Sequence, residues 1–271
     1  MLLGGSLMSR NLLFVTLLTV STVLLTGTAW AQITCPAGTV TIVADRDNTL
    51  YQDGTGMLTN GLGTYLFAGR TGAGGEDIRR AVLHFDVAGA VMAGSTIGPV
   101  RLLMNLDQPK NNGTHDITLH RLTADWGEGS TNDMVMGQGI GAAATTNSAT
   151  WVHTFFDTAS WATQGGDFSP TASASETVAT GTGGTYIWND PDLVADVQSW
   201  LDTPGTNFGW LVLGNESSAP SAARFGTREN TGNEPTLCVE VCTGTPACGV
   251  FDDNFESMDT TGWDVTVGLP E

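Results

Sequence analysis

The sequence predicts an all-β protein, a sandwich of antiparallel sheets with one short helix packed at its edge. Three observations predict it: 35 glycines in 271 residues, short β-branched segments separated by turn residues, and one segment with helical spacing. The glycine content is about twice the average share of roughly 7%. It disfavours a helical bundle, because glycine weakens helix interiors. The length allows one large domain or two small ones.

Short segments rich in β-branched or aromatic residues alternate along the chain with clusters of Gly, Asn, Asp and Pro. In one of them, alternation puts Ala81 and Leu83 on the buried face, while Arg80, Val82 and His84 point outward. His120 points outward by the same reasoning. The predicted strands are Thr39–Val43, Thr64–Ala68, Arg80–Val87, Val100–Leu106, Asp116–Leu122, Thr150–Phe155, Thr185–Trp188, Gly209–Leu213, Ala222–Gly226 and Thr236–Val241.

The segment Asp190–Leu201 has apolar residues at helical spacing. Asp190 can cap its first turn, and Pro191 suits the first helical position. We expect a single helix there, packed on the edge or end of the sandwich. By contrast, Thr123–Ser148 and Thr163–Gly184 show little periodicity and are predicted to be long loops, which are uncommon unless functional or mobile.

Residues 1–31 have the pattern of a secretory signal peptide. An apolar run, Asn11–Leu25, follows Arg10 and precedes the small residues Thr26–Ala31. Cleavage after Ala31 leaves Gln32 as the first mature residue. A membrane anchor is the alternative, but the run is shorter than the ~20 residues that a span needs. We therefore expect a secreted protein, extracellular or at the cell surface, with no membrane partner after the signal is removed.

The four cysteines, an even number, favour disulfides in an exported protein. The preferred pairing is Cys35–Cys238, which ties the two ends of the domain together, with Cys242–Cys248 closing a small loop. Cys35–Cys242 is the second choice, because Cys238 and Cys242 point to the same side of an extended segment. A zinc site is disfavoured, because no paired CxxC spacing occurs and no histidine is near.

The predicted sandwich domain covers residues 32–243. Residues 244–271 form either an acidic C-terminal tail or the start of a truncated further segment, too short to fold alone. The oligomeric state is not indicated by the sequence.

Charge excludes one class of partner. The chain has 10 basic and 28 acidic residues, a formal net charge of −18, and loss of Arg10 with the signal makes it −19. Such a surface repels phosphate groups, so nucleic-acid binding is excluded.

The order and spacing of several segments over Thr39–Val241 resemble the DNRLRE domain family, related to disaggregatase-type and alginate-binding carbohydrate modules. The resemblance implies a jelly-roll β-sandwich that is secreted and often attached to surface proteins or polysaccharide-degrading enzymes. Val250–Trp263 also resembles a short tail common on bacterial secreted proteins. The segments that carry the family resemblance are Ala44–Asp45, Arg79–Val87, Pro99–Leu106, Asp125–Gly129, Ala149–Trp151, Trp161, Gly165–Phe168, Leu193–Leu201, Thr206–Trp210, Arg224–Glu229 and Pro235–Leu237.

Little in the sequence indicates catalysis. Catalysis by paired carboxylates needs two acids about 5–10 Å apart, and Asp125 with Glu128 is the only tempting local pair. Both lie in a glycine-rich turn, where solvated loop residues are the simpler interpretation. No nucleophile elbow, zinc-protease helix or phosphate-binding loop occurs. We expect no catalytic residues.

Sugar binding fits the composition better. Carbohydrates pack their apolar C–H faces on exposed aromatic rings and hydrogen-bond to polar side chains around them. Trp126 and Trp161 lie in predicted loops and are the candidate platforms; the alternative is that they plug the ends of the sandwich. Trp200 and the strand tryptophans Trp151, Trp188 and Trp210 are expected to be buried. The candidate ligand-binding residues are Trp126, Trp161, Asp125, Glu128, Arg80, His84 and His120.

The charge of the glycan is less constrained. An acidic glycan would have to overcome the negative background through a bridging cation or through local arginines, namely Arg79, Arg80, Arg224 and Arg228. A neutral glycan needs neither. The sequence therefore favours a neutral or calcium-bridged polysaccharide.

A structural calcium ion is the one cofactor that the sequence suggests. Asp45, Asp47, Asn48 and Asp53 offer hard oxygen ligands at alternating spacing in one turn region. Ordinary turn chemistry is the alternative, because no EF-hand spacing occurs.

Together these patterns predict a secreted, non-catalytic carbohydrate-binding module whose partner is an extracellular polysaccharide or cell-surface glycan. Two alternatives remain. One is a polysaccharide-degrading enzyme, a lyase or glycoside hydrolase using Asp125 and Glu128. The other is a structural surface or matrix protein whose acidic face binds neighbours rather than sugar.

Overall fold

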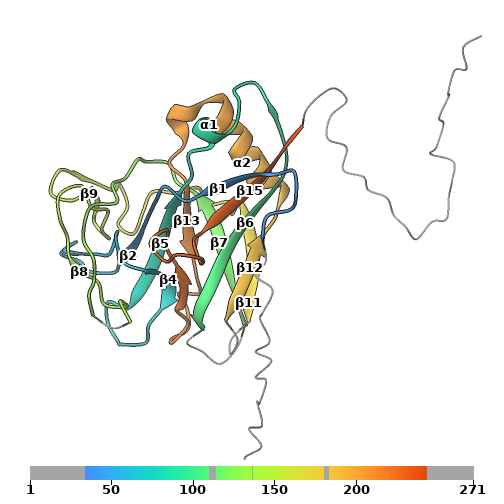
Figure 1. Ribbon diagram of the computed structural model, residues 1–271. Helices are drawn as coiled ribbons and strands as arrows, with labels where there is room; N and C mark the ends of the chain where they lie inside the picture. The colour runs from blue at the N-terminus through green and yellow to red at the C-terminus, as the bar shows by residue number, and fades with distance from the viewer. Residues whose placement is uncertain (1–33, 110–113, 136, 180–182, 243–271) are drawn as a thin grey trace, which may run out of the picture. The chain divides into compact units, whose positions relative to one another are not determined.

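Antiparallel strands dominate the computed structural model, which describes residues 34–109, 114–135, 137–179 and 183–242 (Figure 1). All of these residues belong to one compact unit of the chain. The predicted all-β sandwich is confirmed. In the described part of the chain, no helix has the length and apolar character needed to cross a bilayer.

The main sheet of the described residues has eleven strands in two halves. The first half runs β1 (Val40–Val43), β15 (Thr236–Cys242), β6 (Thr96–Pro109), β14 (Ala223–Gly226) and β4 (Tyr65–Arg70), with β12 (Gly184–Trp188) also paired to β6. The second half runs β5 (Ile78–His84), β13 (Trp210–Leu213), β7 (Thr114–Arg121) and β11 (Ala174–Ala179), with β2 (Arg46–Tyr51) also paired to β5.

Strand β4 connects the two halves. Its first residues pair with β14, whereas Gly69 and Arg70 pair with β5. Gly69 has φ +116°, and a Cβ atom there would lie 2.7 Å from the carbonyl oxygen of Ser221. Only glycine lets the strand turn at this close approach.

The hydrophobic core lies between the two halves. It combines Leu102 and Phe225 from the first half with Leu83 and Trp210 from the second, all fully buried. The expected burial of the tryptophans on strands and helix is confirmed for Trp188, Trp200 and Trp210.

The predicted helix is also confirmed as α2 (Pro191–Asp202), followed by a 3₁₀ turn, Pro204–Thr206. The Asp190 carboxylate accepts a hydrogen bond from the backbone N–H of Asp192, as expected for an N-cap. Leu193, Val197 and Trp200 pack into the core. A second, one-turn helix, α1 (Val87–Ala90), precedes β6.

Loops cover the outer face of the second half. Two small sheets, β3 (Leu58–Thr59) with β8 (Ala142–Ala143) and β9 (His153–Phe155) with β10 (Ala159–Ser160), lie in this layer, and Figure 1 shows β8 and β9 on the side of β2. Beneath it is a second hydrophobic group, called here the outer cluster: Leu50, Val82, Leu122, Trp126, Ala149, Trp151, Trp161 and Leu211.

Two strands of the structure were not predicted from the sequence. Arg46–Tyr51 is a strand although three of its six residues are Arg, Asp and Asn, because it pairs along the whole of Arg79–His84. Ala174–Ala179 was expected in a loop but pairs with β7. In both cases a partner strand overrides weak local propensity.

The Cys35–Cys238 disulfide is confirmed. It excludes the alternative Cys35–Cys242 bond. Cys248 lies outside the described residues, so the Cys242–Cys248 pairing stays a prediction, as do the signal peptide and the acidic tail.

Candidate functional site

The two candidate platform tryptophans are buried, and the prediction that they are exposed was wrong. Trp126 is 0% and Trp161 5% exposed. Each indole N–H donates to a backbone carbonyl, Trp126 to Phe208 and Trp161 to Thr150, both at 2.9 Å. They are buried because Leu50, Val82 and Leu211 make the outer face of the sheet apolar, and the loops cover it. The sequence did contain one sign of this burial, because Val82 is an apolar residue at a strand position predicted to point outward.

The three side chains predicted to point outward, those of Arg80, His84 and His120, do lie on that face, and the loops cover two of them, Arg80 and His120. Arg80 stacks on the rings of Trp151 and Phe168 and forms an ion pair with Glu216 at 2.7 Å. His120 is 7% exposed, and one ring nitrogen lies 2.9 Å from the carbonyl oxygen of Ser169. They are structural parts of the covered face, so the expectation of an exposed polar rim was wrong for Arg80 and His120.

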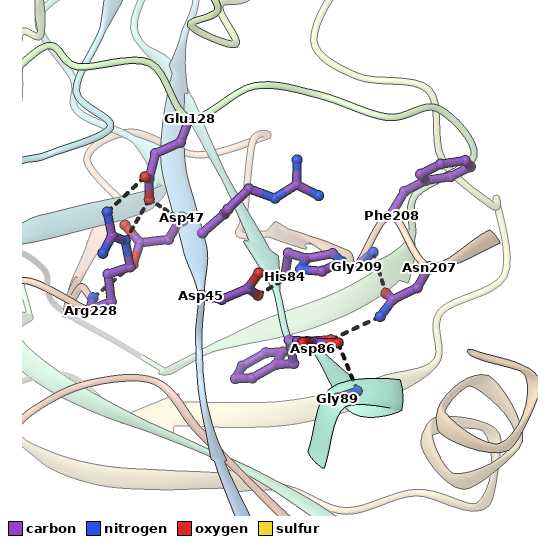
Figure 2. A network of polar contacts seen from close by, with 12 residues as sticks. Asp45, Asp47, His84, Asp86, Gly89, Glu128, Asn207, Phe208, Gly209 and Arg228 are labelled. Atoms are coloured by element: carbon purple, nitrogen blue, oxygen red, sulfur yellow. Dashed lines mark hydrogen bonds and ion pairs between the residues drawn. The ribbon is translucent and has the colours of Figure 1, made fainter. Parts of the chain in front are cut away.

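His84 lies apart from them, at the edge of the loop layer. Its Nδ1 atom is 2.6 Å from Oδ1 of Asp45, a contact drawn in Figure 2. Burial acts to raise the pKa of Asp45, but the hydrogen bond and charge of His84 outweigh it, and the pKa lies below its usual value.

The two candidate acids have separate partners. The Asp125 carboxylate, half exposed, pairs with Arg46 at 3.3 Å. The Glu128 carboxylate accepts two hydrogen bonds from Arg228, each 2.7 Å long. Glu128 also accepts the backbone N–H of Asp47. Because these bonds occupy Glu128, the arrangement offers no free acid facing Asp125 across a cleft.

Glu128 belongs to a partly buried group that we call the Arg228 cluster: Asp47, Glu128, Arg228 and Glu229. Figure 2 shows Asp47, Glu128 and Arg228 converging from β2, from the long loop and from the segment after β14. The guanidinium of Arg228 contacts the carboxylates of Glu128 and Glu229, and its backbone N–H donates to the Asp47 carboxylate at 2.7 Å. Asp47 is 0% exposed, and its Oδ1 atom has no hydrogen-bond partner among the described residues. Burial, with the charges of Glu229 and Glu128, raises the pKa of Asp47 well above its usual value.

This environment predicts a pH effect on stability. The folded protein holds the Asp47 proton more tightly than the unfolded chain does, so stability is lost as the pH rises through the folded-state pKa. The loss amounts to at most about 1.4 kcal/mol per pH unit. We expect the free energy of unfolding of Asp47→Asn, relative to that of the wild type, to increase as the pH rises from about 5 to about 9. Urea unfolding at several pH values measures this difference.

Glu240→Gln is the control, because it removes the same charge from an exposed side chain of β15. It should differ from the wild type by the same amount at every pH. A pH-independent difference between Asp47→Asn and the wild type would contradict the prediction.

The four candidate calcium ligands do not come together. Asp45 contacts His84, Asp47 lies in the Arg228 cluster, and Asp53 accepts hydrogen bonds from Thr55 and Met57 within its own turn. Asn48 is buried, and its amide bonds Thr59 and the Glu128 carbonyl. Among the described residues no three His, Cys, Asp or Glu side chains are grouped as metal ligands.

A cavity of about 400 Å³ lies where the loop carrying Val135 and Gly137–Ile140 meets β4, β5 and β14. Phe67 and the half-exposed side chains of Val135 and Ile140 supply apolar surface. Thr71, Gln138 and two arginines supply polar groups. The loop is fixed in place, because the Tyr51 hydroxyl donates to the carbonyl oxygen of Gln138 at 2.8 Å.

The two arginines are Arg79 and Arg224. Sequence reasoning named four arginines as partners for an acidic glycan, and the structure brings these two to one cavity. Arg80 and Arg228 do not line it and pair with Glu216 and Glu128, and Arg224 is itself paired with Asp107. The cavity itself was missed, because its loop wall shows no periodicity. The available signal was the presence of the apolar residues Val135 and Ile140 in a predicted loop.

No protein-family model and no curated protein matches this chain. The resemblance to the DNRLRE family therefore remains a prediction from the sequence.

Proposed function

We propose that the protein is a secreted, non-catalytic carbohydrate-binding module that attaches to extracellular polysaccharide through the cavity beside Ile140. The N-terminal signal pattern and the Cys35–Cys238 disulfide support export to an oxidising compartment. The observation that carries the binding proposal is the cavity lining, an apolar wall facing hydrogen-bonding side chains on a rigid sandwich.

The cavity volume of about 400 Å³ lies within the range of small-ligand sites. Phe67 and Ile140 can pack against the apolar C–H face of a sugar ring. Thr71 and Gln138 also line the cavity, and their side chains carry groups that can hydrogen-bond to sugar hydroxyls. A non-catalytic role is supported by Glu128, whose carboxylate is bound by Arg228 rather than presented to a substrate. The jelly-roll family resemblance points to the same class of function.

Replacing Ile140 by Ser should weaken retention of the protein in polysaccharide-containing native gels. The side chain is 61% exposed, so its loss should hardly alter stability. Losing its contact with sugar should weaken binding about tenfold, since a covered aliphatic side chain contributes roughly 1–2 kcal/mol.

Met92→Ser is the matched control, because Met92 is 81% exposed and does not line the cavity. It should migrate like the wild type. Absence of retention on every polysaccharide would overturn the proposal and favour a structural matrix role. Release of reducing ends that stops in Glu128→Gln would establish an enzyme instead.

A further inference from the structure

A groove of about 430 Å³, called here the β6–α2 groove, lies between the first part of β6 and the first turns of α2. It exists because the two edges of β6 are paired unequally. On one edge β15 pairs with β6 as far as Thr96, whereas on the other edge β12 ends at Trp188, opposite Leu102. Thr96–Arg101 therefore has one edge without a partner strand among the described residues.

Both walls of the β6–α2 groove carry apolar residues, and the walls are held together. The backbone N–H of Ile97 donates to the Gln198 side chain at 2.8 Å, and the Gln198 amide donates to the Ser95 carbonyl at 3.2 Å. The groove shares no described lining residue with the cavity beside Ile140, so it is a separate surface. Its apolar lining residues are Ile97, Pro99 and Val100 on β6 with Pro191 and Val194 on α2.

Arg101 lines the same groove and is exposed. Six other arginines of the described residues form ion pairs with Asp or Glu, and Arg79 donates to backbone carbonyls. Arg101 has neither kind of contact in the part of the chain that the structure describes. Asp190 also lines the groove, but its carboxylate caps α2 through the N–H of Asp192. An acidic group in the groove would therefore give Arg101 an ion-pair partner.

The chain leaves β15 beside this groove. Cys242, the last described residue, pairs with Thr96, which lines the groove. Neighbouring strands are about 5 Å apart, so the open edge of β6 lies roughly 10 Å from Cys242. Residues 243–248 can span up to about 20 Å, and the residues from Gly249 onward can therefore reach the groove. This short connection gives them a high local concentration there.

Residues 250–255 have a sequence that matches the groove, Val-Phe-Asp-Asp-Asn-Phe. Alternate side chains of an extended segment share a face, so Phe251, Asp253 and Phe255 would point to the same side. Two aromatic side chains with an acidic one between them complement apolar walls that contain an unpaired arginine. The acidic residues at the other positions would face solvent.

We propose that residues 250–256 of this chain bind in the β6–α2 groove, with Phe251 and Phe255 against its apolar walls and Asp253 beside Arg101. Covering an aromatic side chain favours the bound state by about tenfold or more. A segment too short to fold alone gains its order from the neighbouring domain in this way. The inference is independent of the proposed function, because the two surfaces have no described lining residue in common.

Chymotrypsin cleavage of the full chain tests this inference, because the protease cuts the segment only while it is unbound. A synthetic peptide of residues 249–271 gives the cleavage rates of the unbound sequence. Cleavage after Phe251 and Phe255 should be at least about tenfold slower in the full chain than in the peptide. Equal rates in the chain and the peptide would overturn the inference.

Val194→Asp should raise the rate of cleavage after Phe255 by about tenfold, because it places a charge in the apolar wall. Cleavage after Trp263, outside the bound segment, should change little. Ala195→Asp is the matched control, because it adds the same charge at an exposed position of α2 that does not line the groove. It should be cleaved like the wild type, and an equal acceleration in both variants would contradict the inference.

Phe251→Ser makes the test independent of how well the groove variant folds, because it leaves every described residue unchanged. Relative to a peptide with the same substitution, it should also raise the rate of cleavage after Phe255 by about tenfold. An unchanged rate would overturn the inference. Cleavage that accelerates on dilution would show that the segment binds a second copy of the chain, which would overturn its assignment to its own groove.

Arg101→Gln and Asp253→Asn should each raise the cleavage rate after Phe255 by about two- to fivefold, the range of an exposed ion pair. Together they should raise it no more than either does alone, because each removes the same contact. A combined effect equal to the product of the single effects would contradict the pairing of Asp253 with Arg101.

Discussion

Removing the Cys35–Cys238 disulfide, by changing both cysteines to Ala, should cost about 4–5 kcal/mol of stability. The bond joins residues 203 positions apart, and closing a loop of that length in the unfolded chain removes much of its entropy. The bond also anchors β1, an edge strand that pairs, among the described strands, with β15 alone. Its loss should therefore fray Val40–Val43 before the core unfolds.

Urea unfolding with and without the two substitutions measures the effect, and circular dichroism in the absence of urea checks that the β fold persists. Alanine is suited to position 238, because Cys238 is 1% exposed and a polar replacement would add its own burial cost. A loss below about 1 kcal/mol would mean that the unfolded chain is already compact without the bond.

Trp126→Ala should cost about 3–5 kcal/mol, the range for truncating a buried aromatic side chain. The indole is fully buried in the outer cluster, lies under the Arg46 guanidinium at 4.9 Å, and donates to the Phe208 carbonyl. The substitution leaves a cavity and an unsatisfied carbonyl. Loss of the loop layer should precede loss of the sandwich core.

Thermal and urea unfolding measure this cost, with Met92→Ala as the exposed control. The outcome also separates the two roles of Trp126 considered from the sequence. If the variant keeps wild-type stability but no longer binds polysaccharide, Trp126 acts as a binding platform and its buried role is wrong.

The elements predicted best were those whose evidence is local. The capping residues and apolar spacing of Asp190–Leu201 predicted α2, because both operate within one helix. Alternation in Arg80–Val87 correctly separated the core face from the opposite face of β5. Propensity failed at Arg46–Tyr51, a strand that depends on its partner β5 rather than on its own residues.

The candidate site was predicted less well, because alternation identifies a face without showing what covers it. Arg80 and His120 lie on the expected face but beneath loops, and Glu128 is joined to Arg228, 100 residues away. Arg79 was named only as one of four arginines. The position of its guanidinium at the cavity depends on contacts with Gly139, Ile78 and Tyr51, which come from three segments of the chain.

The amino-acid sequence by itself determined the β class, the helix and the acidic charge, since each depends on composition or on short-range order. It also favoured the Cys35–Cys238 bond, because the two cysteines stand near the two ends of the domain. Tertiary structure decided which polar side chains are covered, which are paired and which face a cavity. Burial and pairing depend on residues far apart in the chain, and the energy of a charge depends on those neighbours. For that reason, the guanidinium group of Arg228 makes structural contacts, whereas that of Arg79 lines a cavity.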